Sequence, residues 1–318
     1  MASYLARILI SLTDLAIAEL ETVFDTRVSE VIGRWAVFSC DLDPETLQAK
    51  ASCLAMSKGV YSLLDIADES SFPRRAANVI ENSYRIDVKH THAKTPELMP
   101  VADAIYRELD NPKVDLRDPD HEYLILFSES RIFIAEKLVL ITERFFERRS
   151  HLLSHNHPTS MNPRIARAMI NLSGASSFLD PFCGVGGFLL EGGLLGLNVA
   201  GGDISPDMVS KAKDNLKRFG LDIPVSLCDA RSWDLPVEAI ISDLPYGRNS
   251  PVSESLDLLY ESFFSKAASI TDRLIIGSLA DFPLENLLDT DNWQVSCHFD
   301  IYIHKSMVRR ISVIEKKK

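Results

Sequence analysis

Residues 178–187 read Phe-Leu-Asp-Pro-Phe-Cys-Gly-Val-Gly-Gly, and they mark the point where an apolar strand gives way to a helix. Gly184 and Gly186 allow backbone amides to approach a ligand closely, and ligands of open α/β sheets bind beyond the carboxyl ends of the strands. Strand-like and helix-like segments alternate from this stretch onward. The expected strands are 177–179, 198–202, 224–227, 237–242 and 274–277, and the expected helices are 187–195, 206–219 and 255–270. This order predicts a doubly wound, mostly parallel sheet.

The end of the chain departs from this alternation. Residues 294–304 and 309–314 are two strand-like runs joined by a short turn, with no helix between them. Two neighbouring strands with a short connection are antiparallel. We therefore expect a seven-stranded Rossmann-like α/β domain that ends in an antiparallel hairpin.

The first half of the chain predicts two smaller α+β modules. Expected elements of residues 1–70 are strand 4–11, helix 14–23, strand 34–40 and a helix from Pro44 towards Ser57. Those of residues 71–149 are strand 84–89, helix 97–109 and the paired strands 123–128 and 131–134. A linker at about 150–160 then precedes the Rossmann-like domain, which extends over 150–318.

Composition limits the classes of protein to consider. The chain has 318 residues, of which 46% are hydrophobic and 25% charged, and a formal charge of −11, which argues against indiscriminate nucleic-acid binding. Residues 71–150 carry 13 basic and 14 acidic groups, so cations are concentrated there. The five cysteines form no Cys-x-x-Cys pair, which disfavours a disulfide framework or a structural zinc site. No apolar run is long enough to span a membrane, and Met1 to Thr13 lacks a signal-peptide cleavage site, so we expect a cytoplasmic protein.

Two further acids follow strands of the predicted sheet. Asp203, in Asp203-Ile204, stands where many nucleotide-binding sheets place an acid that accepts hydrogen bonds from ribose hydroxyls. Asp229, in Asp229-Ala230, is suited to accept from the exocyclic amine of an adenine. The glycine turn and these two acids together predict an adenosine pocket. A nicotinamide dinucleotide is disfavoured, because its fingerprint needs a third glycine where this chain has Leu189.

The sequence Asp243-Leu244-Pro245-Tyr246 follows the fourth strand and predicts the chemistry. An amine conjugated to a purine is a poor nucleophile, because its lone pair is delocalised into the ring. The carboxylate of Asp243 and the main-chain carbonyl of Leu244 would accept its two hydrogens and aim the lone pair, while Tyr246 would stack on the base. Direct methyl transfer from a sulfonium is then governed by positioning, and it requires no metal.

These motifs resemble those of class I S-adenosylmethionine-dependent methyltransferases that methylate amines, in which the fourth motif reads Asp/Asn-Pro-Pro-Tyr. Residues 84–137 look like a THUMP domain, an RNA-binding module, and residues 1–70 like the ferredoxin-like module that precedes it. The segment Met161 to Met169 and the end His304 to Arg310 are similar to archaeal tRNA (guanine-10-N2) methyltransferases. The resemblance implies S-adenosylmethionine as cofactor and tRNA as partner, with a small zinc-binding activator subunit as a further partner to test.

The resemblance also implies roles for individual residues. It assigns Asp180, Gly184 and Gly186 to the methionine end of the cofactor, Asp203 with Ile204 to the ribose, and Asp229 with Ala230 to the adenine. The residues that would hold the guanine amine are Asp243, Leu244, Pro245 and Tyr246. Leu244 departs from the family pattern, which has a proline there, but leucine supplies the same backbone carbonyl and precedes a proline that restricts it to extended geometry.

Several alternatives stay open at the sequence level. The same chemistry could act on a guanine at tRNA position 6 or in ribosomal RNA, and the chain could instead be a non-catalytic tRNA-binding protein. Arg144, Arg148 and Arg149 could meet phosphates or form a solvated face. Arg309 and Arg310, which flank the final hairpin, are expected to contact the substrate.

Overall fold

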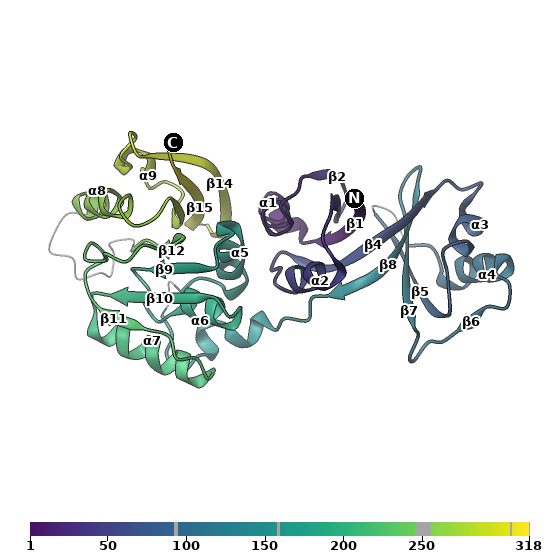
Figure 1. The fold of residues 1–318 in the computed structure, drawn as a ribbon, viewed down its shortest axis with the longest axis horizontal. Helices are drawn as coiled ribbons and strands as arrows, with labels where there is room; N and C mark the ends of the chain where they lie inside the picture. The colour runs from purple at the N-terminus through teal and green to yellow at the C-terminus, as the bar shows by residue number, and fades with distance from the viewer. Residues whose placement is uncertain (92–94, 158–159, 246–255, 306, 318) are drawn as a thin grey trace. The chain divides into compact units, whose positions relative to one another are not determined.

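The computed structural model describes residues 1–91, 95–157, 160–245, 256–305 and 307–317. Its contacts divide the chain into two compact units, Met1–Thr142 and Glu143–Lys318. Figure 1 labels the helices and strands of each unit. In the described part of the chain, no helix is long and apolar enough to cross a lipid bilayer.

The first unit is built on one eight-stranded sheet with the order β2-β3-β1-β4-β8-β7-β5-β6. Its strands are β1 (Ala2–Ile8), β2 (Val28–Ile32), β3 (Trp35–Cys40), β4 (Ser57–Ala67), β5 (Ser83–His90), β6 (Lys113–Val114), β7 (His121–Phe127) and β8 (Ile132–Leu140). Its helices are α1 (Thr13–Phe24), α2 (Pro44–Ser52), α3 (Phe72–Ala77) and α4 (Leu98–Glu108). The sheet continues across the expected boundary at residue 70, because β4 pairs with both β1 and β8. The division of this unit into modules 1–70 and 71–149 stays a prediction.

The expected helix from Pro44 towards Ser57 is wrong in its second half. Helix α2 ends at Ser52, and the long strand β4 begins at Ser57. The buried carboxylate of Glu19 accepts the amide N–H groups of Ala55 and Met56, at 2.8 and 2.7 Å. A side chain distant in sequence therefore satisfies the backbone of the turn and directs the chain into the sheet.

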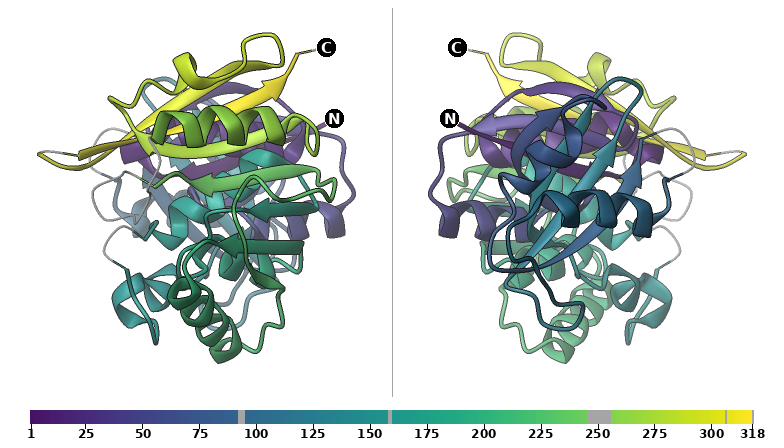
Figure 2. Two further views of the ribbon diagram at one scale, coloured as in Figure 1. Left: turned by 90° about the vertical axis from the view of Figure 1, so that its left-hand side faces the viewer. Right: turned by 90° about the vertical axis from the view of Figure 1, so that its right-hand side faces the viewer.

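The second unit contains the predicted Rossmann-like sheet. Seven strands lie in the order β11-β10-β9-β12-β13-β15-β14. They are β9 (Ser177–Asp180), β10 (Asn198–Asp203), β11 (Val225–Leu227), β12 (Ala239–Asp243), β13 (Arg273–Leu279), β14 (Trp293–His304) and β15 (Met307–Lys316). The first five are parallel to one another, and β15 pairs antiparallel with both β13 and β14. The predicted terminal hairpin is thus confirmed, and Figure 2 shows its two strands side by side.

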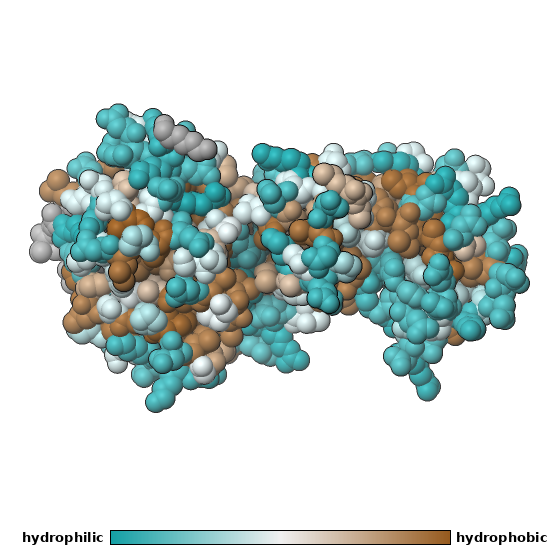
Figure 3. Space-filling view, in the orientation of Figure 1, coloured by the Kyte–Doolittle hydropathy of each residue, from teal (hydrophilic) through white to brown (hydrophobic). Residues whose placement is uncertain are grey.

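Helices cover both faces of this sheet. They are α5 (Pro163–Ser173), α6 (Gly187–Leu194), α7 (Pro206–Arg218), α8 (Leu256–Ala267) and α9 (Leu284–Leu287). Figure 1 shows α5 and α6 on one face and α8 and α9 on the other, as the doubly wound fold requires. The core beneath α8 includes Phe263, Phe264 and Trp293. The surface seen in Figure 3 mixes hydrophilic and hydrophobic residues on each unit, which is usual for globular proteins.

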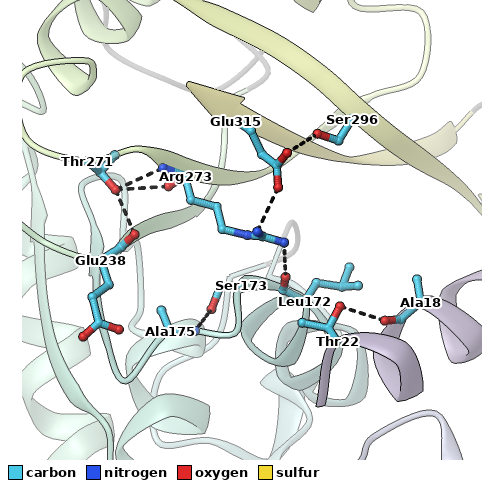
Figure 4. Close-up of polar contacts among 10 residues, drawn as sticks. All are labelled: Ala18, Thr22, Leu172, Ser173, Ala175, Glu238, Thr271, Arg273, Ser296 and Glu315. Carbon is cyan, nitrogen blue, oxygen red and sulfur yellow. Dashed lines mark hydrogen bonds and ion pairs between the residues drawn. The ribbon is translucent and has the colours of Figure 1, made fainter. Parts of the chain in front are cut away.

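Arg273 fixes the C-terminal end of α5 against the sheet (Figure 4). One guanidinium nitrogen donates to the Glu315 carboxylate at 2.9 Å, and another donates to the Leu172 carbonyl at 3.0 Å. Glu315 also accepts from the Ser296 hydroxyl at 2.8 Å. The last carbonyls of a helix have no partner within the helix, so this arginine satisfies one of them while joining α5 to β13 and β15.

A buried ion network joins the segment before α5 to the domain. Arg148 and Arg167 both contact the carboxylate of Glu191 on α6, with shortest distances of 2.6 and 2.8 Å. All three side chains are buried, and Phe145 packs against the guanidinium groups. The expectation that Arg148 stands at the surface with Arg144 and Arg149 is therefore wrong for Arg148, because its charge is used inside the protein.

Candidate functional site

The carboxyl ends of three adjacent parallel strands each carry an aspartate. Asp180 ends β9, Asp203 ends β10 and Asp243 ends β12, and β9 lies between the other two strands in the sheet. Parallel neighbours have their carboxyl ends at the same edge. Both Asp203 and Asp243 lie close enough to Asp180 to interact electrostatically with it. The sheet therefore places these three predicted site residues at one edge.

Asp180 is the most deeply buried of the three, with 1% of its surface exposed. One carboxylate oxygen accepts from the Ser242 hydroxyl at 2.6 Å and from the Phe182 amide at 3.2 Å. The pKa of Asp180 is raised to about 7, chiefly by burial and also by the charges of Asp203 and Asp243, although the two hydrogen bonds lower it. Near neutral pH this group is thus divided between its protonated and ionised forms.

The glycine turn wraps around the carboxylate of Asp203. The amide of Gly184 donates to one oxygen at 3.0 Å, and the amide of Ser205 donates to the other at 2.9 Å. Each carboxylate oxygen has two lone pairs, so both keep capacity for a further donor such as a ribose hydroxyl. Ser205, which accepts from the Met208 amide at 3.4 Å, caps α7 and leaves Asp203 to the loop.

Gly184 and Gly186 have φ values of +51° and +87°, a region that favours glycine. A Cβ at Gly184 or Gly187 would meet nothing within 4 Å, so the backbone of this turn faces open space. A Cβ at Gly186 would instead lie 3.2 Å from the Ala212 Cβ on α7. The turn therefore presents bare backbone on one side, as a ligand loop requires, and packs tightly against a helix on the other.

The third predicted acid has a partner that the sequence did not indicate. Asp229 forms hydrogen bonds with the Arg231 guanidinium through both oxygens, at 2.9 and 2.7 Å. These bonds hold the pKa of the Asp229 carboxyl below its usual range. The Arg231 backbone amide also donates to it at 2.8 Å, so Asp229 is an ionised acceptor that already holds donors on both oxygens. Its neighbour Ala230 is buried, while Ile204 on the adjacent loop is 64% exposed.

The backbone after Asp243 is anchored at two points. The Leu244 amide donates to the Gly277 carbonyl at 2.9 Å, and its side chain is buried. The Tyr260 hydroxyl donates to the Pro245 carbonyl, and this tyrosine is itself buried. Burial raises the pKa of Tyr260, and the charge of Asp243 raises it further, so the hydroxyl stays a donor. Tyr246, the fourth predicted residue of this motif, lies outside the described residues.

Two residues that sequence reasoning did not assign to the site, Gly277 and Met161, lie beside the pair formed by Arg309 and Asp243. Arg309 on β15 lies 3.2 Å from one of its oxygens and 3.1 Å from the Met161 sulfur. Gly277 on β13 makes room for the other oxygen, because a Cβ there would lie 2.6 Å from it. Arg309 is buried beside this carboxylate, and its expected contact with the substrate stays a prediction.

Arg310 has a different environment from its neighbour. It is paired with the Asp300 carboxylate through two hydrogen bonds of 2.7 and 2.8 Å. Cys183, in the glycine turn, is buried, and burial raises the pKa of its thiol far above the usual value. This favours its interpretation as a packing residue, because the thiolate is the nucleophilic form. Among the residues that the structure describes, no three His, Cys, Asp or Glu side chains are grouped as a metal site would require.

Known proteins share this architecture and sequence. The RMKL-like methyltransferase domain family matches residues 151–308. The tRNA (guanine(10)-N2)-dimethyltransferase of Methanothermobacter thermautotrophicus is 36% identical over 224 residues, which is 67% of this chain and 66% of that protein. The match thus spans just under two thirds of that relative's length. The probable tRNA (guanine(10)-N2)-dimethyltransferase of Methanothermococcus thermolithotrophicus is 32% identical over 171 residues, covering 48% of this chain and 98% of that protein.

A solved structure shares the fold of the whole chain. The crystal structure of TrmN from Thermus thermophilus matches 99% of this chain and 100% of its own, with a TM-score of 0.54 and 20% identity. At this identity the likeness concerns the fold alone, and it agrees with an N-terminal mixed-sheet module followed by a Rossmann-like sheet. The sequence relatives carry the assignment further: this chain belongs to the family of the tRNA (guanine(10)-N2)-dimethyltransferases.

Proposed function

We propose that this protein transfers methyl groups from S-adenosylmethionine to the exocyclic N2 of a guanine in tRNA, with guanine 10 as the expected position. The observation that carries the proposal is the edge formed by Asp203, Asp180 and Asp243 on adjacent strands. At this edge, Asp203 would accept hydrogen bonds from a nucleoside, and Asp243 would accept them from an amine. Membership of the family supports both the reaction and the substrate class.

The chain offers groups that fit the cofactor. Asp203 keeps lone pairs for the ribose hydroxyls, and the Gly184 backbone faces open space beside it. Asp180 would lie by the methionine end, and Asp229 with Ala230 would lie by the adenine. When bound, S-adenosylmethionine would supply an electrophilic methyl group on a cationic sulfonium, which an acidic edge favours.

The guanine amine would be held by two acceptors. The Asp243 carboxylate and the Leu244 carbonyl would each accept one N2 hydrogen, which aims the nitrogen lone pair at the methyl group. Anchoring of Leu244 through its amide and of Pro245 through its carbonyl keeps this backbone in place before the base arrives. Tyr246 is proposed to stack on the base. The target base must leave its stack to reach such a site. We expect the protein to recognise the rest of the tRNA by its folded shape.

Methyl incorporation into an unmodified tRNA transcript tests this function. We expect the wild type to transfer label from S-adenosylmethionine, and Asp243→Ala to lose about 10²–10³-fold in rate, as when one polar group of a catalytic site is removed. Binding of S-adenosylhomocysteine by both proteins, measured by calorimetry, serves as the control for an intact cofactor site. A wild type that binds the cofactor product and tRNA but transfers no methyl group would support the non-catalytic alternative.

Mass spectrometry of the digested product separates the remaining alternatives. N2-methylguanosine or N2,N2-dimethylguanosine in the fragment containing position 10 supports the proposal. The same nucleosides at tRNA position 6, or only in ribosomal RNA, would retain the chemistry and change the substrate. The ratio of the two nucleosides tells whether one or two transfers dominate.

Partners and location complete the proposal. A small zinc-binding activator subunit is proposed from the family resemblance, and the test is a comparison of activity with and without such a subunit. We also propose that residues 1–70 and 71–149 act as ferredoxin-like and THUMP modules that bind tRNA, and that the protein works in the cytoplasm. Deletion of residues 1–142, the first compact unit, should then abolish tRNA binding and leave binding of S-adenosylhomocysteine intact.

A further inference from the structure

We propose that Arg309 is a positioning residue that keeps the Asp243 carboxylate ionised and fixed for the target amine. This role rests on the proposed function, because it concerns the acceptor that would hold guanine N2. No motif of the sequence assigns Arg309 to this task. Its neighbour on the same strand, Arg310, offers a matched comparison.

The geometry of Arg309 is that of a charge built into the site. It is 5% exposed, and it extends from β15, which lies two strands away from β12, to within 3.2 Å of an Asp243 oxygen. Its other terminal nitrogen lies 3.1 Å from the sulfur of Met161, which is also buried. The guanidinium is therefore held inside the protein beside Asp243, where a positive charge favours the ionised carboxylate.

The surroundings of Asp243 show why this charge is needed. The Asp243 side chain is 16% exposed, which disfavours its ionised form. It faces the carboxyl of Asp180 from β9 and the hydroxyl of Tyr260 from α8, and it interacts electrostatically with both. A second carboxyl nearby also disfavours ionisation, and a phenol adds no positive charge. Arg309 supplies a positive charge that offsets burial and the neighbouring acid.

The state of Asp243 decides what it can do for an amine. An ionised carboxylate accepts hydrogen bonds at both oxygens, whereas a protonated one is also a donor. If a protonated Asp243 turned its O–H towards an N–H of guanine, the amine would lose one of the two hydrogen bonds that aim the nitrogen lone pair. Arg309 would therefore act on the rate through Asp243, without touching the base.

The test is the pH dependence of kcat/KM for methyl transfer to tRNA in the wild type, Arg309→Met and Arg309→Lys. Loss of an adjacent arginine should move the acid limb of the profile upward by about 1 to 3 pH units in Arg309→Met. Arg309→Lys, which keeps a cation, should give a smaller shift. Arg310→Met is the matched control for the titration, because Arg310 is paired with Asp300, and the midpoint of its acid limb should coincide with that of the wild type whatever its rate.

A second readout does not depend on turnover. The ¹³C carboxyl resonance of Asp243, identified by its loss in Asp243→Asn, should titrate at higher pH in Arg309→Met than in the wild type. Thermal unfolding and calorimetric binding of S-adenosylhomocysteine confirm that each variant is folded. An unchanged acid limb and an unchanged Asp243 titration in Arg309→Met would overturn the inference, whatever happens to the rate. A wild type that methylates no guanine would overturn the proposed function instead, and the titration would still decide the role of Arg309.

Discussion

Substitution of Gly277 by alanine is the sharpest small change that the site allows. The added Cβ would lie 2.6 Å from one Asp243 oxygen and 3.2 Å from the terminal methyl of Met161. Since ordinary contact begins at 3.4 Å, the carboxylate must move by about 0.8 Å. Arg309, on the other side of Asp243, limits how that movement can be absorbed.

A displacement of this size has a calculable effect on rate. A misplacement of about 1 Å in a catalytic arrangement costs about 100-fold, which corresponds to about 2.7 kcal/mol of activation free energy. We expect Gly277→Ala to lower kcat for tRNA methylation by this amount. Affinity for S-adenosylhomocysteine should be retained, because the clash is with Asp243, not with the glycine turn or Asp203. Overpacking should also reduce the free energy of unfolding by about 1 to 3 kcal/mol.

The assay is single-turnover methyl transfer to an unmodified transcript, with saturating cofactor and urea unfolding of the same samples. Gly193→Ala on α6 is the control, because its Cβ would approach the flexible side-chain ends of Ile223 and Leu221 at 2.6 and 2.9 Å, away from the acidic edge. That variant should keep its rate within about threefold of the wild type. If Gly277→Ala remained folded and also kept its rate within threefold, Asp243 would not be the acceptor that positions the guanine amine.

Three other predictions follow from buried groups. Tyr260→Phe removes the hydroxyl that donates to the Pro245 carbonyl. We expect the activation free energy of methyl transfer to rise by about 1 kcal/mol, which lowers kcat roughly fivefold. An unchanged kcat would contradict this anchoring role. Asp180 has a folded pKa of about 7, above its ordinary value of 3.8, so stability should fall as pH rises between these values, and urea unfolding of Asp180→Asn should lack that slope. Glu191→Ala removes the carboxylate that pairs with the buried Arg167 and Arg148, of which Arg148 keeps its contact with Glu143, and it should cost about 3 to 5 kcal/mol in urea unfolding. Glu147→Ala, in an exposed pair, should cost under about 1 kcal/mol; equal losses would refute the distinction.

The sheet of the second unit could be predicted because its sequence signals are local. Each parallel strand is a short apolar run, and each is followed by a polar residue where the strand ends. Asp180, Asp203 and Asp243 could therefore be placed at strand ends without knowing any contact. Because the carboxyl ends of parallel strands lie at the same edge of a sheet, the sequence pattern alone predicted that these acids lie in one region.

The strands of the first unit were harder, because their partners are distant in sequence. Strand β4 carries exposed polar positions beside buried ones and ends in a charged stretch, so its periodicity is weak. Its residues are held by β1 and β8, which lie about fifty or more residues away on either side. Pairing between remote segments is decided by tertiary contacts that no local window contains.

The two arginines of β15 show what the alternation of side chains along a strand can predict. Successive side chains of a strand point to opposite faces of the sheet, so Arg309 and Arg310 cannot share one environment. One is buried beside Asp243, and the other forms an outer pair with Asp300. The alternation alone predicts that at most one of them serves an exposed substrate surface. Which of the two is buried depends on Met161 and β12, and these contacts are tertiary.

The charge distribution of the site constrains how a chain of net charge −11 could serve a tRNA. The edge that carries Asp180, Asp203 and Asp243 would repel phosphates, but it suits a cationic donor and an amine. Arg309 is turned inward to Asp243 and Arg231 to Asp229, so these cations balance acids of the site and do not attract the RNA backbone. In the first unit, Arg75 and Arg131 are likewise paired with acids. Under the proposed function, other cations would meet the phosphates of the tRNA, and a base extruded from its helix would reach the acidic edge.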